Sequence, residues 1–137
     1  MIQVFCNKRG SGKTKNLIDL ANSQSETISG HIVYIDDDSR PMHSLNRKIR
    51  FITTKDFELK EFEGLYGYLC GILSGDYDIE QIYIDGLSNI VDGDLPDAAF
   101  LFSKLDDISE EFNVDFFINI NEDNCSEIPD FIKKYVA

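Results

Sequence analysis

Five short apolar runs, rich in β-branched and aromatic residues, alternate with segments of helical periodicity along this chain. The apolar runs cover residues 2–6, 31–35, 50–53, 81–86 and 114–120, and the helical segments cover about 12–28, 65–73, 94–113 and 126–135. Strands that alternate with helices pair in parallel, and the helices then cover both faces of the sheet. We therefore expect an α/β fold, a three-layer α/β/α sandwich around a mostly parallel five-stranded sheet. At 137 residues the chain fits a single minimal domain, 1–137.

The first apolar run leads into a glycine- and serine-containing turn and then into a helical pattern, IQVFCNKRGSGKTKNLIDL over residues 2–20. A turn that places successive backbone N–H groups at a helix N-terminus forms a cradle for anions. In such a loop Lys13 would reach the β- and γ-phosphates and Thr14 would hold Mg²⁺. The segment therefore predicts a phosphate-binding loop, or P-loop, whose ligand is a nucleoside triphosphate.

The usual P-loop pattern begins with glycine, where this chain has Asn7. Asparagine tolerates positive φ, so it can occupy a turn position that glycine normally fills. An ordinary glycine-rich turn is the alternative reading. The expected nucleotide-binding residues are Asn7, Lys8, Arg9, Gly10, Ser11, Gly12, Lys13, Thr14 and Lys15.

Polar residues follow the other predicted strands. Asp36, Asp37 and Asp38 follow the second strand, Asp85 ends the fourth, and Asn119 and Asn121 end the last. Because the carboxyl ends of parallel strands meet at one edge of a sheet, we expect these groups to surround the P-loop. Asp85 would help Thr14 to hold Mg²⁺; the alternative is that Asp85-Gly86 is only a turn.

These segments together resemble RecA-like P-loop NTPases. VYIDDDSR resembles the acidic strand end that follows the P-loop helix in that family, IYIDGLSNI its Walker B strand, and FFININED its last core strand with a γ-phosphate-sensing amide. The resemblance implies that Asp38 orients the attacking water, with Asp36 as the second candidate and Lys13 as the catalytic cation. It also implies that Asn121 or Asn119 is the sensor.

The chain departs from ATPases that place a glutamate directly after the Walker B aspartate. That position is Gly86, so a general base must lie elsewhere or be absent. Asp38 stands where the family has glutamate and is one methylene shorter, which implies slow hydrolysis.

Two further resemblances exist. Lys8 occupies the signature-lysine position of deviant Walker A ATPases of the partition and septum-site type. The chain also resembles small bacterial P-loop proteins often labelled twitching-motility PilT-like, although 137 residues cannot hold the additional domain of a pilus-retraction motor. Four arginines are candidates for an arginine finger across a subunit boundary, with solvated surface residues as the alternative: Arg9, Arg40, Arg47 and Arg50.

The net charge of −12 is unevenly distributed, with ten Lys and Arg against seven Asp and Glu in residues 1–60, and three against eighteen in residues 61–137. This acidity opposes nucleic-acid binding. No apolar run reaches the roughly 18 residues of a membrane span, and a strand beginning at Ile2 leaves no room for a signal peptide, so we expect a cytoplasmic protein. Three widely separated cysteines, Cys6, Cys70 and Cys125, lack a zinc spacing and are expected to be reduced.

The sequence thus predicts a Mg²⁺-dependent protein that binds ATP or another nucleoside triphosphate and acts as a slow ATPase or nucleotide-dependent switch. One alternative is a non-hydrolysing regulatory module whose nucleotide state sets its affinity for a protein partner or for a second copy of the chain. The other is a small-molecule kinase, against which stands the lack of an insert for an acceptor pocket or lid.

Overall fold

The computed structural model describes residues 1–7, 13–121 and 125–137, without the side chains of Asn7, Lys13 and Cys125. The predictions for Lys8, Arg9, Gly10, Ser11 and Gly12 lie outside the described residues. The strands are β1 (Ile2–Asn7), β2 (His31–Asp36), β3 (Ile49–Thr53), β4 (Ile79–Asp85) and β5 (Asp115–Asn121). The helices are α1 (Lys13–Ser25), α2 (Phe62–Ser74), α3 (Leu87–Ile90), α4 (Ala99–Phe112) and α5 (Asp130–Lys133), with short 3₁₀ turns η1 (Arg40–Ser44), η2 (Leu95–Ala98) and η3 (Cys125–Glu127).

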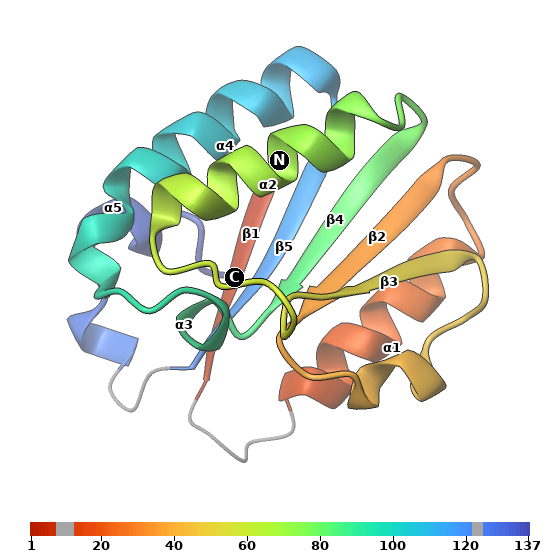
Figure 1. Ribbon diagram of the computed structural model, residues 1–137, viewed down its shortest axis with the longest axis horizontal. Helices are drawn as coiled ribbons and strands as arrows, with labels where there is room; N and C mark the ends of the chain where they lie inside the picture. The colour runs from red at the N-terminus through yellow and green to blue at the C-terminus, as the bar shows by residue number, and fades with distance from the viewer. Residues whose placement is uncertain (8–12, 122–124) are drawn as a thin grey trace.

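All five strands form one parallel sheet in the order β1-β5-β4-β2-β3 (Figure 1). This confirms the expected α/β class and the parallel five-stranded sheet. Although β1 and β2 are consecutive in sequence, β5 and β4 lie between them, so α1 must cross two strands before the chain re-enters the sheet. The carboxyl ends of β2, β4 and β5 are consequently neighbours, with Asp36 opposite Asp85 and Asp85 opposite Asn119.

Helices cover both faces of the sheet, as the alternating pattern predicts (Figure 1). Leu17, Ile18 and Ala21 of α1 pack with Ile32 and Tyr34 of β2 on one face. Val33 and Ile35, the intervening residues of β2, belong to the core on the other face of the sheet. In that core they join Leu65 and Leu69 of α2 and Leu101 and Leu105 of α4. Because both faces of the central strands are buried, their sequences are almost continuously apolar.

A row of aromatic rings crosses the face of the sheet that α1 covers. Phe51, Tyr34, Tyr83 and Phe117 occupy register positions on β3, β2, β4 and β5. Their rings stack with centroid separations of 6.4, 6.0 and 4.7 Å along the row. Tyr34 and Tyr83 are completely buried. The row therefore fixes the positions of two phenol groups inside the molecule.

Most predicted elements end within a few residues of their expected bounds. Asn113 closes α4 in the left-handed conformation, with φ of 55°. The segment expected to form one terminal helix over 126–135 is instead η3 followed by α5, because Pro129 precedes the helix and cannot lie inside it. Two short elements, η1 and α3, were not predicted, since four or five residues are too few to show a helical period.

Backbone hydrogen bonds join the end of the chain to β1. The N–H of Val4 donates to the carbonyl of Tyr135 over 2.8 Å, and the N–H of Ala137 donates to the carbonyl of Val4 over 3.0 Å. Val4 and Val136 thus form a parallel bridge at the outer side of β1.

Two other expectations concern the chain as a whole. Within the described residues, none of the helices has both the length and the apolar character needed to cross a membrane. Cys6 is disulfide-bonded and Cys70 is free, so the expectation of reduced cysteines is wrong for Cys6.

Candidate functional site

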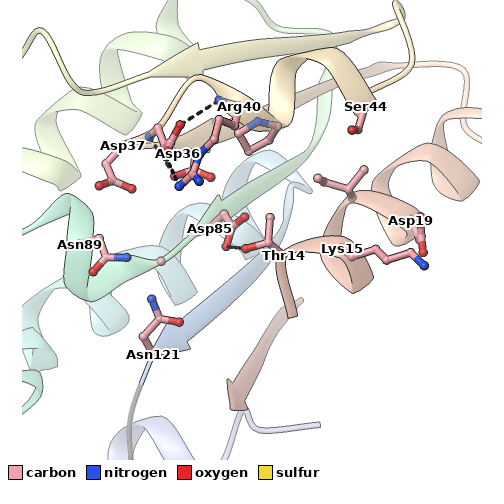
Figure 2. A pocket seen from close by; sticks show the side chains of 14 residues that line it. Thr14, Lys15, Asp19, Asp36, Asp37, Arg40, Ser44, Asp85, Asn89 and Asn121 are labelled. Carbon is pink, nitrogen blue, oxygen red and sulfur yellow. Dashed lines mark hydrogen bonds and ion pairs between the residues drawn. The ribbon is translucent and has the colours of Figure 1, made fainter. Parts of the chain in front are cut away.

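A cavity of about 640 Å³ lies at the carboxyl edge of the sheet. Its walls come from the start of α1, the segment between β2 and η1, the end of β4 with α3, and the end of β5 (Figure 2). The lining residues are Thr14, Lys15, Ile18, Asp19, Asp36, Asp37, Asp38, Arg40, Pro41, Ser44, Asp85, Gly86, Asn89 and Asn121. The polar residues predicted at separate strand ends therefore do meet at one site.

The start of α1 contacts the end of β4. The Thr14 hydroxyl, on the second residue of α1, donates a hydrogen bond of 3.3 Å to Oδ1 of Asp85, the last residue of β4 (Figure 2). These residues are 71 positions apart in the sequence. Both groups offer hard oxygen ligands of the kind that Mg²⁺ prefers. The pair therefore fits the magnesium site that the sequence predicts.

Asp85 is a buried carboxylate that accepts hydrogen bonds at both oxygens; the residue is only 3 % exposed. Oδ2 accepts a bond of 2.8 Å from the Tyr34 hydroxyl, and Oδ1 accepts one of 3.2 Å from Nδ2 of Asn119 in addition to the bond from Thr14. These donors compensate for the water that the carboxylate loses on burial. Asp85 is thus held in one orientation by residues of three separate elements.

Asp36 is the first of the three acids after β2 and lies beside Asp85 in the sheet. Burial raises the pKa of Asp36 to about 9, and a hydrogen bond with Asp37 and the charge of Asp85 act in the same direction. The N–H of Asp38 donates to Oδ1 of Asp36 over 3.1 Å, which opposes that rise only in part. Burial and the acids Asp37 and Asp85 therefore favour the protonated form of Asp36.

Asp38 binds Arg40, the first residue of η1. Its Oδ1 accepts a hydrogen bond of 2.9 Å from the Arg40 backbone N–H, and its Oδ2 accepts one of 2.6 Å from Nε of the same residue, with Nη2 completing the ion pair. The Arg40 guanidinium lowers the pKa of Asp38 below its usual value. The acid expected to orient water is thus ionised but paired with a cation.

Two amide side chains of the cavity, Asn89 and Asn121 (Figure 2), lie near Gly86. Asn121 ends β5, and its buried Oδ1 has no hydrogen-bond partner among the described residues. Asn89 lies on α3, which is why sequence periodicity could not identify it as a site residue. Gly86 has φ of 79°, and a Cβ there would lie 3.1 Å from Nδ2 of Asn89. The left-handed backbone therefore favours glycine at the position where many ATPases carry glutamate.

Asn7, Lys13 and Lys15 are the remaining predicted site residues in the part of the chain that the structure describes. Asn7 is the last residue of β1 and Lys13 the first of α1, so the segment between them connects the sheet to the helix that carries Thr14. Lys15 is exposed and lines the cavity. The roles given to Asn7 and to residues 8–15 stay predictions, as do those of Asp36, Asp38, Asp85 and Asn121.

The fold and the cavity define a class of molecule: a parallel α/β domain whose acids and amides gather at the carboxyl edge of the sheet, beside the N-terminus of a helix. A scan of protein-family models and a search of curated proteins found no match for this chain. The contacts within the site therefore carry the functional interpretation.

Proposed function

We propose that this chain binds a nucleoside triphosphate together with Mg²⁺ in the cavity at the carboxyl edge of its sheet, and that it acts as a slow ATPase or a nucleotide-dependent switch. The observation that carries the proposal is the contact between the Thr14 hydroxyl and Asp85, 3.3 Å apart at the junction of α1 and β4. A P-loop NTPase needs a hydroxyl at the start of its first helix beside an acid at the end of another strand of the sheet.

The start of α1 supports the phosphate part of this proposal. The first N–H groups of a helix have no partner within the helix and carry partial positive charge. The first turn of α1 contains no acidic residue that would repel an anion. Lys13 stands at its first position and Lys15 lines the cavity. We therefore assign the phosphates to the segment that leads into α1.

Thr14 and Asp85 would hold the metal. When bound, Mg²⁺ supplies positive charge that neutralises the β- and γ-phosphate oxygens. Asn121 supplies a further polar group, because its buried Oδ1 lacks a partner among the described residues. An amide at that place can orient a terminal phosphate or a water molecule.

The acids around the cavity explain why we propose slow turnover. Burial favours the protonated form of Asp36, and Asp38 is paired with Arg40. Gly86, with φ of 79°, provides no carboxylate at the position where many ATPases carry the glutamate that activates water. Asp38 can orient water only after its bonds to Arg40 have loosened. The same pairing favours the second candidate, a module that binds nucleotide without hydrolysing it.

Nucleotide titration of the Thr14→Ala variant tests the proposal. The wild-type chain should bind ATP more tightly with Mg²⁺ than with EDTA, and Thr14→Ala should weaken the Mg²⁺-dependent binding by at least about 10-fold, since the variant removes a metal ligand. Thr27→Ala is the matched control, because Thr27 lies just beyond the other end of α1, where its hydroxyl donates a hydrogen bond to the carbonyl of Gln24. Isothermal calorimetry with ATP and GTP gives the affinities. Absence of nucleotide binding to the wild-type chain at millimolar concentration would refute the proposal.

A phosphate-release assay on the same samples then separates the two candidates. Release that requires Mg²⁺ and is lost in Thr14→Ala supports an ATPase. Mg²⁺-dependent binding without release, even at high protein concentration, supports the non-hydrolysing module.

A further inference from the structure

Tyr34 connects the buried aromatic row to the acid at the centre of the candidate site. Its hydroxyl donates a hydrogen bond of 2.8 Å to Oδ2 of Asp85. Thr14 and Asn119 bind the opposite oxygen, Oδ1. Tyr34, on β2, is therefore the hydrogen-bond partner of the Asp85 oxygen that does not bind Thr14.

The position of the Tyr34 hydroxyl is set by packing. The ring is completely buried and stacks between Phe51 and Tyr83, with interplanar angles of 26° and 11°. A ring enclosed on both sides in a close-packed layer cannot swing away from its partner. The hydroxyl is thus fixed by the sheet before any ligand binds.

The Tyr34 hydroxyl donates the hydrogen bond to Asp85 and so needs its proton. Burial and the negative charge of Asp85 both raise the pKa of Tyr34. An ionised carboxylate accepts hydrogen bonds and cannot donate them, so the Tyr34 hydroxyl is the donor in this bond. The bond therefore favours one orientation of Asp85 and opposes rotation of its carboxylate.

We propose that Tyr34 is a positioning residue that holds the Asp85 carboxylate so that Oδ1 faces Thr14 and the metal. This inference rests on the proposed function of the cavity. Without the hydroxyl, Oδ2 would be a buried acceptor lacking its partner, and the carboxylate would turn to find another donor or water. Oδ1 of Asp85, the proposed metal ligand, would then move away from the Thr14 hydroxyl.

Tyr83 provides a control within the same row. It lies opposite Tyr34 on β4, is equally buried, and its hydroxyl also makes a bond of 2.8 Å. That bond goes to Oε1 of Gln81, two residues before Tyr83, whereas Asp85 lies two residues after it. Tyr83→Phe therefore removes the same atom from the same layer without touching Asp85.

The test compares Tyr34→Phe with Tyr83→Phe in a Mg²⁺ titration of binding to a non-hydrolysable ATP analogue. Tyr34→Phe should raise the Mg²⁺ concentration needed for half-maximal enhancement of analogue binding by about 10- to 100-fold. This is the usual loss of metal affinity when a hydrogen-bond partner of a metal ligand is removed. Its binding of the analogue in EDTA should be unchanged, and Tyr83→Phe should keep the wild-type Mg²⁺ requirement. Thermal melts of both variants measure the purely structural loss, which should be similar because each loses one buried hydroxyl.

A second measurement needs no substitution. In wild-type chain carrying ¹³C-labelled tyrosine, adding Mg²⁺ to the analogue complex should shift the Cζ resonance of Tyr34 and leave that of Tyr83 in place. Equal Mg²⁺ requirements for the two variants, or an unmoved Tyr34 resonance, would overturn the role of Tyr34 while nucleotide binding by the wild type stands. A wild-type chain without any Mg²⁺-dependent binding would overturn both proposals.

Discussion

At the scale of single residues, the three consecutive acids after β2 have three different environments. Asp36 is buried beside Asp85, Asp37 hydrogen-bonds to Asp36 and lines the cavity, and Asp38 is paired with Arg40. Asp36 and Asp38, only two residues apart, thus have pKa values shifted in opposite directions, by burial in one case and by Arg40 in the other. The partner of Asp38 can move away, since the Arg40 side chain is 88 % exposed.

Asp38→Asn tests the assignment of the water-orienting acid. The variant should release phosphate about 10²- to 10⁴-fold more slowly, which is the usual contribution of a general base. Its affinity for Mg²⁺ and ATP should be unchanged, because Thr14 and Asp85 are untouched. Steady-state phosphate release and calorimetry measure the two quantities. Asp37→Asn is the matched control, and a wild-type rate in Asp38→Asn would exclude Asp38 as the base.

At the scale of elements, the five strands could be predicted because each is a β-branched or aromatic run bounded by turn residues. The position of Asp85 beside Thr14 followed from one rule about parallel sheets. Tyr34 could not be identified in this way, because its bond to Asp85 depends on β2 and β4 being neighbours, and the order of strands is not written in their periodicity. Arg40 and Asn89 were missed as cavity residues for another reason: they lie on η1 and α3, which are too short to show a period.

The turn between β4 and α3 yields a prediction about stability. Gly86→Ala should lower the free energy of unfolding by about 1–2 kcal/mol, the cost of a left-handed conformation for a residue with Cβ. The added Cβ would also press on Nδ2 of Asn89. Gly67→Ala should instead raise stability by about 0.5–1 kcal/mol, because alanine is the better residue inside a helix and nothing lies within 4 Å of the added atom. Urea unfolding of both variants measures the difference, and a neutral Gly86→Ala would contradict the strained turn.

At the scale of the whole molecule, the sheet has two chemically different edges. The carboxyl edge carries the cavity with its acids and amides. Near the amino end of β2, His31 forms an exposed ion pair with Asp76 over 2.7 Å, outside the cavity. The pair should therefore influence folding without influencing nucleotide binding.

The His31–Asp76 pair predicts how stability depends on pH. The hydrogen bond and charge of Asp76 raise the pKa of His31 above 6.5. A histidine whose pKa is raised by folding stabilises the native state below its unfolded pKa, and this contribution disappears as the pH rises through the folded pKa. His31→Gln should therefore be less stable than the wild type at about pH 5.5 and equal to it at about pH 9.

Urea unfolding at the two pH values, with His43→Gln as the exposed control, measures this effect. If His31→Gln is destabilised equally at both pH values, the ion pair makes no pH-dependent contribution to the free energy of unfolding. Nucleotide affinity should not change in either variant.

The bridge between Val4 and Val136 has a consequence for contacts with other polypeptides. An outermost strand normally offers a row of unsatisfied amides and carbonyls to which another chain can add. On β1 the carbonyl and N–H of Val4 are already taken by residues 135–137. Lateral extension of this sheet by a foreign strand would consequently proceed from β3, on the side farthest from the end of the chain.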